Sequence, residues 1–311
     1  MEEEEKPNTF RKIVGIILVM IVILMTIVYW FIPLNSITFE MRTSESTNFS
    51  LSPYGVEGMQ FYSNLRYVDE NITYNIMEDC TLQKKADMTL ALEILENETM
   101  LKFQEVLSNE EISITCSGNN KISGDFFVAG EGGPTNITKT DNFNVISTGK
   151  ILLIKESSCS QPNVALHEAL HALGFDHSSN TNNIMYNYSR CTHTMGQDIP
   201  QLINELYSVP PLVDLALENI SATMNGQYMD TNVTIRNHGL KKSKLAKLEI
   251  YAGDKLVKEV DVNPMEIGGG RMIVLTSNWI AKSNFDKLKY VIVSTEEELF
   301  TENNQVILSI S

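Results

Sequence analysis

The stretch from Val164 to Ser178, VALHEALHALGFDHS, constrains this chain more than any other, because it spaces three histidines, a glutamate and a glycine like a metal site. On an α-helix, residues four apart share a face, so His167 and His171 would turn toward one zinc ion at about 2.0–2.1 Å. Gly174 permits a sharp turn after them, since glycine adopts positive φ at little steric cost. That turn would return His177 as third ligand. Three protein ligands leave a fourth position open, as in catalytic zinc sites.

Glu168 would sit beside the metal without ligating it. As general base it would take a proton from a zinc-held water, whose pKa the ion lowers to about 7, while the hydroxide attacks a polarised carbonyl. The pattern therefore predicts peptide hydrolysis without a covalent intermediate. The alternative is a buried amphipathic helix whose histidines face inward, since its apolar residues would suit a core. The glycine at the turn favours the metal site.

The segment HEALHALGFDHS resembles the zinc signature HExxHxxGxxH of the metzincin metallopeptidases, and its ending in His177-Ser178 is closest to the matrixin branch. The resemblance assigns Met185, within the sequence NIMY, to the methionine turn beneath the metal. Asp198-Ile199 and Leu206-Tyr207 resemble parts of the closing matrixin helix. Leu170 departs from the family, which usually has glycine there, so packing around the zinc helix is expected to differ.

The resemblance implies that residues 61–208 form an α+β metzincin-type catalytic domain, in which a twisted, mostly parallel sheet lies above the zinc helix. One antiparallel edge strand would pair with the substrate backbone. Hydrophobic patterning predicts a helix over 82–98 and several strands. These strands are expected at Ile72–Ile76, Glu111–Thr115, Asp125–Ala129, Asn144–Ser147 and Lys150–Lys155. Which of Asp125–Ala129 and Asn144–Ser147 is the substrate-binding edge stays open.

The same region contains residues that could form further metal sites. Gly130, Gly132 and Gly133 indicate a loop, which with the nearby acids Asp125, Glu131 and Asp141 is a candidate calcium site; a solvated loop is the favoured alternative. Beyond the three ligands, only His193 and His238 remain among the five histidines. Many animal matrixins hold a second zinc through three histidines and an aspartate, which this chain cannot supply. We therefore predict a single zinc.

Four cysteines allow three disulfide connectivities. We favour Cys80–Cys116 and Cys159–Cys191, because the second pair would bracket the zinc helix and the methionine turn. Free structural thiols are the alternative, which an oxidising space disfavours.

The N-terminal region predicts a membrane anchor. Residues 1–12 form a polar tail, and Ile13 to Ile32 is a run of 20 uncharged residues, long enough to span about 30 Å of hydrocarbon. Arg11 and Lys12 flank its start, so the positive-inside rule places the N-terminus in the cytoplasm and the rest outside the cell. All cysteines lie beyond the run, as do the Asn-x-Ser/Thr sequons at Asn48, Asn71, Asn97, Asn136, Asn187, Asn219 and Asn232. Residues 33–60 are polar and are expected to form an irregular stalk.

Val209-Pro210-Pro211 ends the catalytic region, since consecutive prolines cannot continue a helix. Residues 212–311 alternate short apolar runs with turn signals, which predicts an all-β, immunoglobulin-like sandwich of about seven strands. Its beginning, from Asp214 to Ile220, and the stretch from Phe300 to Asn304 resemble the CARDB module. Because it shows no catalytic constellation, we expect this domain to bind a surface protein or glycan, to recruit substrate, or to act as a spacer.

Together these features predict a membrane-anchored zinc endopeptidase that cleaves extracellular protein or peptide substrates. A net charge of −15 and the lack of a basic patch argue against nucleic acid as a partner. The alternative is an inactive surface binding protein with a metzincin fold. Glu168 discriminates between them, because the base and all ligands are present.

Overall fold

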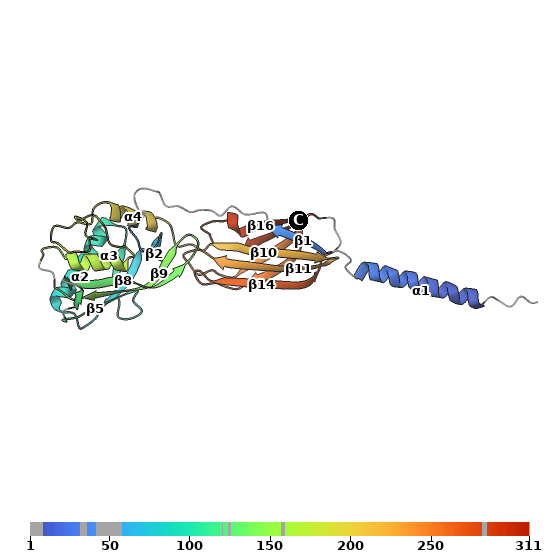
Figure 1. Cartoon of the computed structure of the whole chain (residues 1–311), viewed down its shortest axis with the longest axis horizontal. Coiled ribbons are helices and arrows are strands. Elements are labelled where there is room, and N and C mark those ends of the chain that lie inside the picture. The colour runs from blue at the N-terminus through green and yellow to red at the C-terminus, as the bar shows by residue number, and fades with distance from the viewer. Residues whose placement is uncertain are drawn as a thin grey trace, which may run out of the picture.

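The computed structural model describes residues 9–31, 36–41, 58–119, 121–123, 126–156, 159–281 and 285–310. Figure 1 shows an α/β part beside an all-β part. The α/β part is built on a sheet in which β2, β9, β5, β3 and β4 lie in that order and are mutually parallel, while β8 pairs antiparallel with β9. Its strands are β2 (Leu65–Tyr67), β3 (Asn71–Ile76), β4 (Lys102–Glu105), β5 (Ile112–Cys116), β8 (Gly130–Lys139) and β9 (Asn144–Leu153). A short hairpin is formed by β6 (Lys121–Ser123) and β7 (Phe126–Val128). The mostly parallel sheet confirms the predicted α+β class.

Three helices accompany this sheet: α2 (Leu82–Glu98), α3 (Asn163–Ala172) and α4 (Asp198–Tyr207). The bounds of α2 match the predicted 82–98, and Thr81 accepts the Lys84 N–H at its N-cap. Buried side chains of all three helices and of the sheet form one hydrophobic core. Leu170 is fully buried in it, so the leucine that replaces the family's glycine fills core space.

The glycine-rich stretch is a strand, where the sequence indicated a loop. Gly130, Gly132 and Gly133 lie in β8, the antiparallel edge strand, and β9 is one strand that unites the two predicted segments at 144–147 and 150–155. A Cβ on Gly132 would lie 2.2 Å from the Glu168 backbone oxygen, and one on Gly130 would lie 2.7 Å from the Glu168 Cγ. Gly130 and Gly132 are needed because β8 passes directly against helix α3, whereas a Cβ on Gly133 would meet nothing within 4 Å.

Both predicted disulfides are present. Cys80 pairs with Cys116, with 4.9 Å between their Cα atoms, and Cys159 pairs with Cys191, with 5.2 Å between theirs. The second bond joins the chain just before α3 to the loop after Met185. It therefore closes the segment that contains the zinc helix and the methionine turn, as expected.

The all-β part is an antiparallel sandwich. Seven of its strands follow the domain boundary, and all seven correspond to predicted apolar runs. They are β10 (Leu215–Asn225), β11 (Tyr228–Asn237), β12 (Ala246–Ala252), β13 (Lys255–Val262), β14 (Gly270–Trp279), β15 (Lys287–Val293) and β16 (Gln305–Ile310), with a 3-10 turn η1 (Glu302–Asn304) before the last. A hydroxyl contact of 2.8 Å between Thr231 and Tyr290 joins β11 to β15 within the core.

The eighth strand of this sheet comes from the other end of the chain. β1 (Ser36–Met41) pairs antiparallel with β10 on one side and with β16 on the other. These residues were expected to form an irregular stalk, so the expectation was wrong for them. Phe39 is buried in the sandwich core, and its ring stacks on Phe285 at a centroid distance of 6.1 Å. The catalytic domain is thus inserted between two neighbouring strands of the sandwich.

The two parts share a small interface centred on the β8–β9 turn. Phe143 in this turn forms a buried apolar cluster with Val145 of β9 and with Leu240 of the sandwich region. Asn142 donates from Nδ2 to the Asp214 carboxylate at 3.3 Å. Arg66 of β2 donates to the Val209 carbonyl at 2.8 Å, where the chain leaves the catalytic domain. The turn that ends the edge strand β8 is therefore held by the sandwich.

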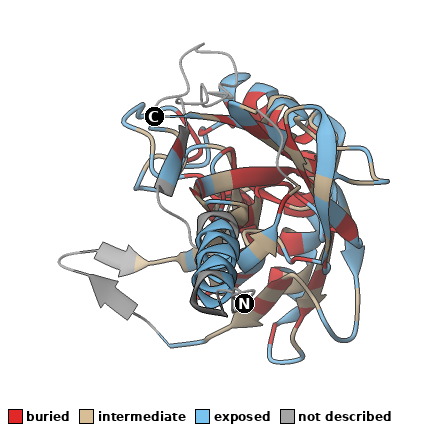
Figure 2. Cartoon of the chain, turned by 90° about the vertical axis from the view of Figure 1, so that its right-hand side faces the viewer, coloured by how far each residue is buried: buried red, intermediate tan, exposed pale blue. Residues whose placement is uncertain are grey.

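The N-terminal helix α1 (Thr9–Phe31) covers most of the apolar run. Its side chains are described for residues 12–27 and are exposed along this length (Figure 2). Among the described residues, no helix is both long and apolar enough to cross a membrane. The predicted membrane span over 13–32 is therefore not supported by the described residues.

We predict that Phe39→Ala destabilises the sandwich, because it empties a core site that only β1 fills. The expected loss is about 3 kcal/mol or more of unfolding free energy, as for large aromatic truncations in cores. Urea denaturation of the full-length protein, followed by tryptophan fluorescence, would measure it. Ile37→Ala, on the same strand but with an exposed side chain, is the matched control and should change stability by less than about 1 kcal/mol. Equal effects of the two variants would contradict the role given to β1.

Candidate metal centre

Helix α3 and the turn after it bring the three predicted ligands together. The Nε2 atoms of His167 and His171 are 3.0 Å apart, and those of His171 and His177 are 3.2 Å apart. The first two lie four positions apart on the helix, and the chain then reverses direction, which brings back the third. The three imidazoles form one group of candidate metal ligands.

The opposite ring nitrogens fix the protonation of two of these imidazoles. His167 Nδ1 lies 2.7 Å from the Ile184 carbonyl, and His171 Nδ1 lies 2.8 Å from the Phe175 carbonyl. A carbonyl only accepts, so each Nδ1 carries the hydrogen and each Nε2 presents a lone pair. Burial lowers the pKa of His167 to about 4 and also lowers the pKa of His171, which keeps both rings neutral.

This donor set fits a zinc ion. Lone pairs that face one another at such distances repel unless a cation lies between them. Tetrahedral zinc with bonds of about 2.0–2.1 Å places its ligand nitrogens about 3.3 Å apart, close to the separations between these Nε2 atoms.

Gly174 makes the turn that the sequence predicts. It has a φ of +99°, and the Phe175 N–H donates to the Leu170 carbonyl while the Gly174 N–H donates to the His171 carbonyl. This pair of bonds is the Schellman motif that ends many helices. A Cβ at Gly174 would also lie 2.6 Å from the Leu65 side chain, so both φ and space select glycine.

Glu168 is buried in the middle of α3, next to His167, and β8 covers its side chain. Burial raises the pKa of its carboxyl to about 8, and the neighbouring Glu131 charge acts in the same direction. A bound cation would act the other way, since a nearby positive charge favours the ionised form. The carboxyl is therefore placed to exchange a proton near neutral pH.

The methionine turn supports the site through its backbone. Asn183 is buried, and its side-chain oxygen accepts the Met185 N–H at 2.8 Å, which tightens the turn that presents the Ile184 carbonyl to His167. The Met185 carbonyl accepts the Ser178 N–H at 2.8 Å, next to His177. Met185 itself is buried in the core of the domain.

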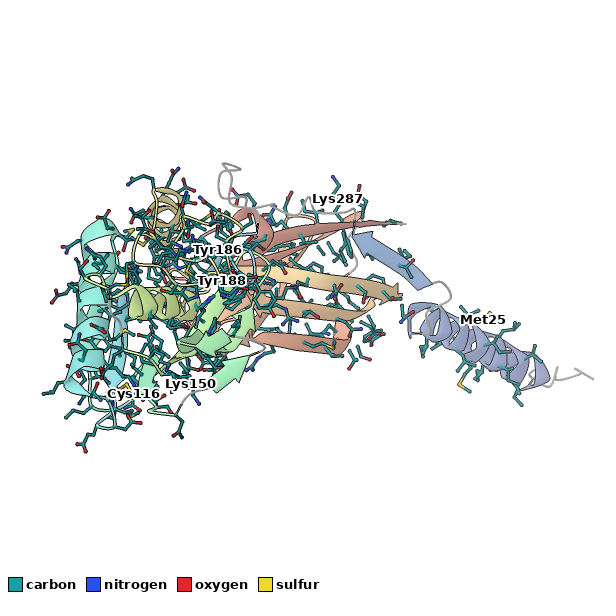
Figure 3. The ribbon with its side chains drawn as sticks, turned by 60° about the vertical axis from the view of Figure 1, so that its left-hand side comes forward. Met25, Cys116, Lys150, Tyr186, Tyr188 and Lys287 are labelled. Carbon is teal, nitrogen blue, oxygen red and sulfur yellow. A yellow bond between two sulfur atoms is a disulfide. The ribbon has the colours of Figure 1, made fainter. Side chains whose placement is uncertain are left out.

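One aromatic side chain borders the three histidines, and two others follow the methionine turn. The Phe61 ring stacks on His171 at a centroid distance of 5.8 Å. Tyr186 and Tyr188 project near one another after the methionine turn, with ring centroids 5.8 Å apart (Figure 3). The His193 ring packs edge to face against the Tyr186 ring, with centroids 6.2 Å apart. His193 is buried and does not belong to the group of candidate ligands.

The acids considered for calcium are not brought together. Glu131 lies on β8, Asp125 falls outside the described residues, and Asp141 lies in the β8–β9 turn. Asp141 instead approaches His238 and Glu218 of the sandwich, in a second group of candidate ligands.

The hydrogen bonds of this second group join the two domains and do not form a metal site. The Asp141 N–H donates to His238 Nδ1 at 3.2 Å, so the hydrogen of this ring is on Nε2. His238 Nε2 donates to the Glu218 carboxylate at 2.7 Å. Both nitrogens of this neutral imidazole are thereby used, which leaves no lone pair for a cation.

The sequence predicts the three histidines and the glutamate that lie together here, but not the groups that hold them in place. The missed groups are the backbone carbonyls that orient two histidines, the side chain that caps the methionine turn, and the glycines that let β8 approach α3. They are the carbonyls of Phe175 and Ile184, the side chain of Asn183, and Gly130 and Gly132. Asn183 carried the one available signal, since an asparagine two residues before Met185 favours a side-chain-capped turn.

Comparison with known proteins agrees with these features. The family model described as Matrixin matches residues 66–208, and the model described as CARDB matches residues 212–307. A similar solved structure is the CARDB domain of the PF1109 protein from Pyrococcus furiosus, in complex with di-metal ions. It has 17% identity and a TM-score of 0.28, and the match covers 32% of this chain and 88% of that one. No curated protein matches the chain. The chain therefore carries a matrixin domain followed by a CARDB domain.

Proposed function

We propose that this protein is a zinc-dependent endopeptidase whose catalytic base is Glu168. The matrixin domain supports a metallopeptidase class of hydrolase. The observation that carries the proposal is the convergence of three imidazole Nε2 atoms with a buried carboxyl on α3, the helix that carries two of the three histidines.

His167, His171 and His177 would hold the zinc. A zinc ion bound there supplies a Lewis acid that acidifies water and polarises a carbonyl. Glu168 would take the proton from the attacking water and later deliver it to the leaving amine, so one carboxyl serves as base and then as acid. Its burial under β8 keeps other water away from that proton.

We infer that an extended substrate binds along β8. This strand pairs with β9 on one side only within the described part of the chain, so its other edge offers backbone donors and acceptors. Addition of a peptide to such an edge gives affinity through main-chain hydrogen bonds. Because β8 contacts the zinc helix at Glu168, a peptide on this edge would run past the base.

We also propose that the protein is held at the cell surface by residues 13–32, with both domains outside the cell. The uncharged run, the exposed apolar side chains of α1 and the flanking Arg11 and Lys12 support this placement. The two disulfides fit an oxidising space. The sequon asparagines in the described residues are all exposed, as a glycan requires: Asn71, Asn97, Asn136, Asn187, Asn219 and Asn232. The sandwich would then present its surface to a protein or glycan.

Glu168→Gln should lower turnover of casein or a peptide library about 100-fold or more, because it removes the base and leaves the ligands. Elemental analysis should still find one zinc per full-length chain. His177→Ala is the matched control, which should lose zinc and activity together. A Glu168→Gln variant as fast as its parent would refute the mechanism. A zinc-loaded parent that cleaves nothing would favour the inactive binding protein instead.

The raised pKa of Glu168 predicts how pH affects the metal-free protein. Its carboxyl has a pKa of about 8 when folded against an ordinary 4.5, so between these values the folded state binds more protons than the unfolded state. The unfolding free energy should therefore fall as pH rises through this window. Glu168→Gln removes this effect. In urea denaturation of the metal-free proteins, the unfolding free energy of the variant should therefore rise relative to that of the parent as pH increases. Parallel pH profiles would contradict the burial of an ionisable group here.

The proposed topology predicts that protease added to intact cells removes a C-terminal tag from the full-length protein and spares an N-terminal tag. The protein should also stay with membranes after an alkaline carbonate wash. A protected C-terminal tag would place the enzyme in the cytoplasm. Mature protein in the medium, starting near residue 33, would make the apolar run a signal peptide.

A further inference from the structure

A short segment before the first strand of the catalytic domain lies against the turn at Gly174 and Phe175 that follows α3. Met59, Gln60 and Phe61, here called the buttress segment, form an antiparallel bridge with the turn at Phe175. The Phe61 N–H donates to the Gly174 carbonyl at 3.0 Å, and the Asp176 N–H donates to the Met59 carbonyl at 2.9 Å. Two backbone hydrogen bonds thus hold the turn on both sides of Phe175.

Phe175 is the residue whose carbonyl orients a ligand. Its oxygen lies 2.8 Å from His171 Nδ1 and so holds this imidazole with Nε2 toward the other two histidines. The orientation of His171 therefore depends on where the buttress segment holds the turn. The Phe61 ring adds a second contact, since it stacks on the His171 ring with an interplanar angle of 20°.

The buttress segment is itself fastened to the sheet. The Gln60 side chain donates to the Leu65 carbonyl at 2.7 Å and accepts the Leu65 N–H at 3.2 Å. Leu65 begins β2, and its side chain packs where a Cβ on Gly174 would stand. Gln60 thus connects the sheet to Phe175, and the Phe175 carbonyl connects to His171.

We propose that the buttress segment positions the zinc ligand His171 and so sets how tightly the site retains its metal. Phe61 is a positioning residue in this proposal, because its ring touches a ligand and its N–H holds the turn. The proposal rests on zinc being the metal of the proposed function. Groups that orient metal-bound histidines typically change metal affinity about 10-fold to 100-fold when they are removed.

The test is the rate at which the full-length, zinc-loaded protein gives up zinc to a chelator in excess. Phe61→Ala should release zinc about 10-fold faster than the parent. Phe61→Tyr keeps the ring and should stay within about 2-fold. Tyr62→Ala, which removes a more exposed ring from the next residue, is the matched control and should behave like the parent. The visible spectrum of the cobalt-substituted protein should change in Phe61→Ala only.

Thermal unfolding of the metal-free variants separates positioning from general stability. If Phe61→Ala lowers the unfolding temperature but releases zinc at the parental rate, the proposal fails. It also fails if Tyr62→Ala releases zinc as fast as Phe61→Ala. Because no substrate is used, a parent that retains zinc but cleaves nothing would refute the peptidase alone. A parent that binds no zinc would refute both.

Discussion

Two hydrogen bonds from imidazole Nδ1 atoms to backbone carbonyls are the interaction on which the metal centre depends. They leave the Nε2 lone pairs of His167 and His171 free and aim them at one point. Each acceptor lies in a turn with its own support, the Schellman turn for Phe175 and the asparagine-capped turn for Ile184. Ligand geometry is therefore a property of two turns as much as of the zinc helix.

The same end of the domain concentrates further constraints. Glycines 130 and 132 let the edge strand reach the zinc helix, so the base lies under the strand that we infer binds substrate. The β8–β9 turn at the end of that strand is bonded to the sandwich through Asp141 and Asn142. The proposed base, the strand proposed to bind substrate and the second domain are thus connected by direct contacts.

Local patterns predicted much of this structure. The grouping of the three histidines beside Glu168, the positive φ of Gly174 and helix α2 follow from spacing and side-chain chemistry within short windows. The seven later strands follow from apolar runs and turn signals. The matrixin and CARDB resemblances rest on equally local motifs. What escaped prediction is non-local: the pairing of β1 with strands far along the chain, and the contact of Asp141 with His238. Glycine-rich β8 was taken for a loop because glycines lower strand propensity, whereas here close approach to a helix selects them.

If α1 holds the protein at a surface, as proposed above, the position of β1 decides how the protein can be released from it. A strand buried between β10 and β16 is held by two ladders of hydrogen bonds and by the Phe39 side chain. A single backbone break between residues 42 and 57 would separate helix α1 from the catalytic domain in sequence but leave it attached through the sandwich. Release would then require the strand to be pulled from its sheet, which opens a seam between β10 and β16. A cut on the helix side of Ser36 would instead free both domains and leave the sheet intact. Cleavage at two positions a few residues apart would therefore have opposite results.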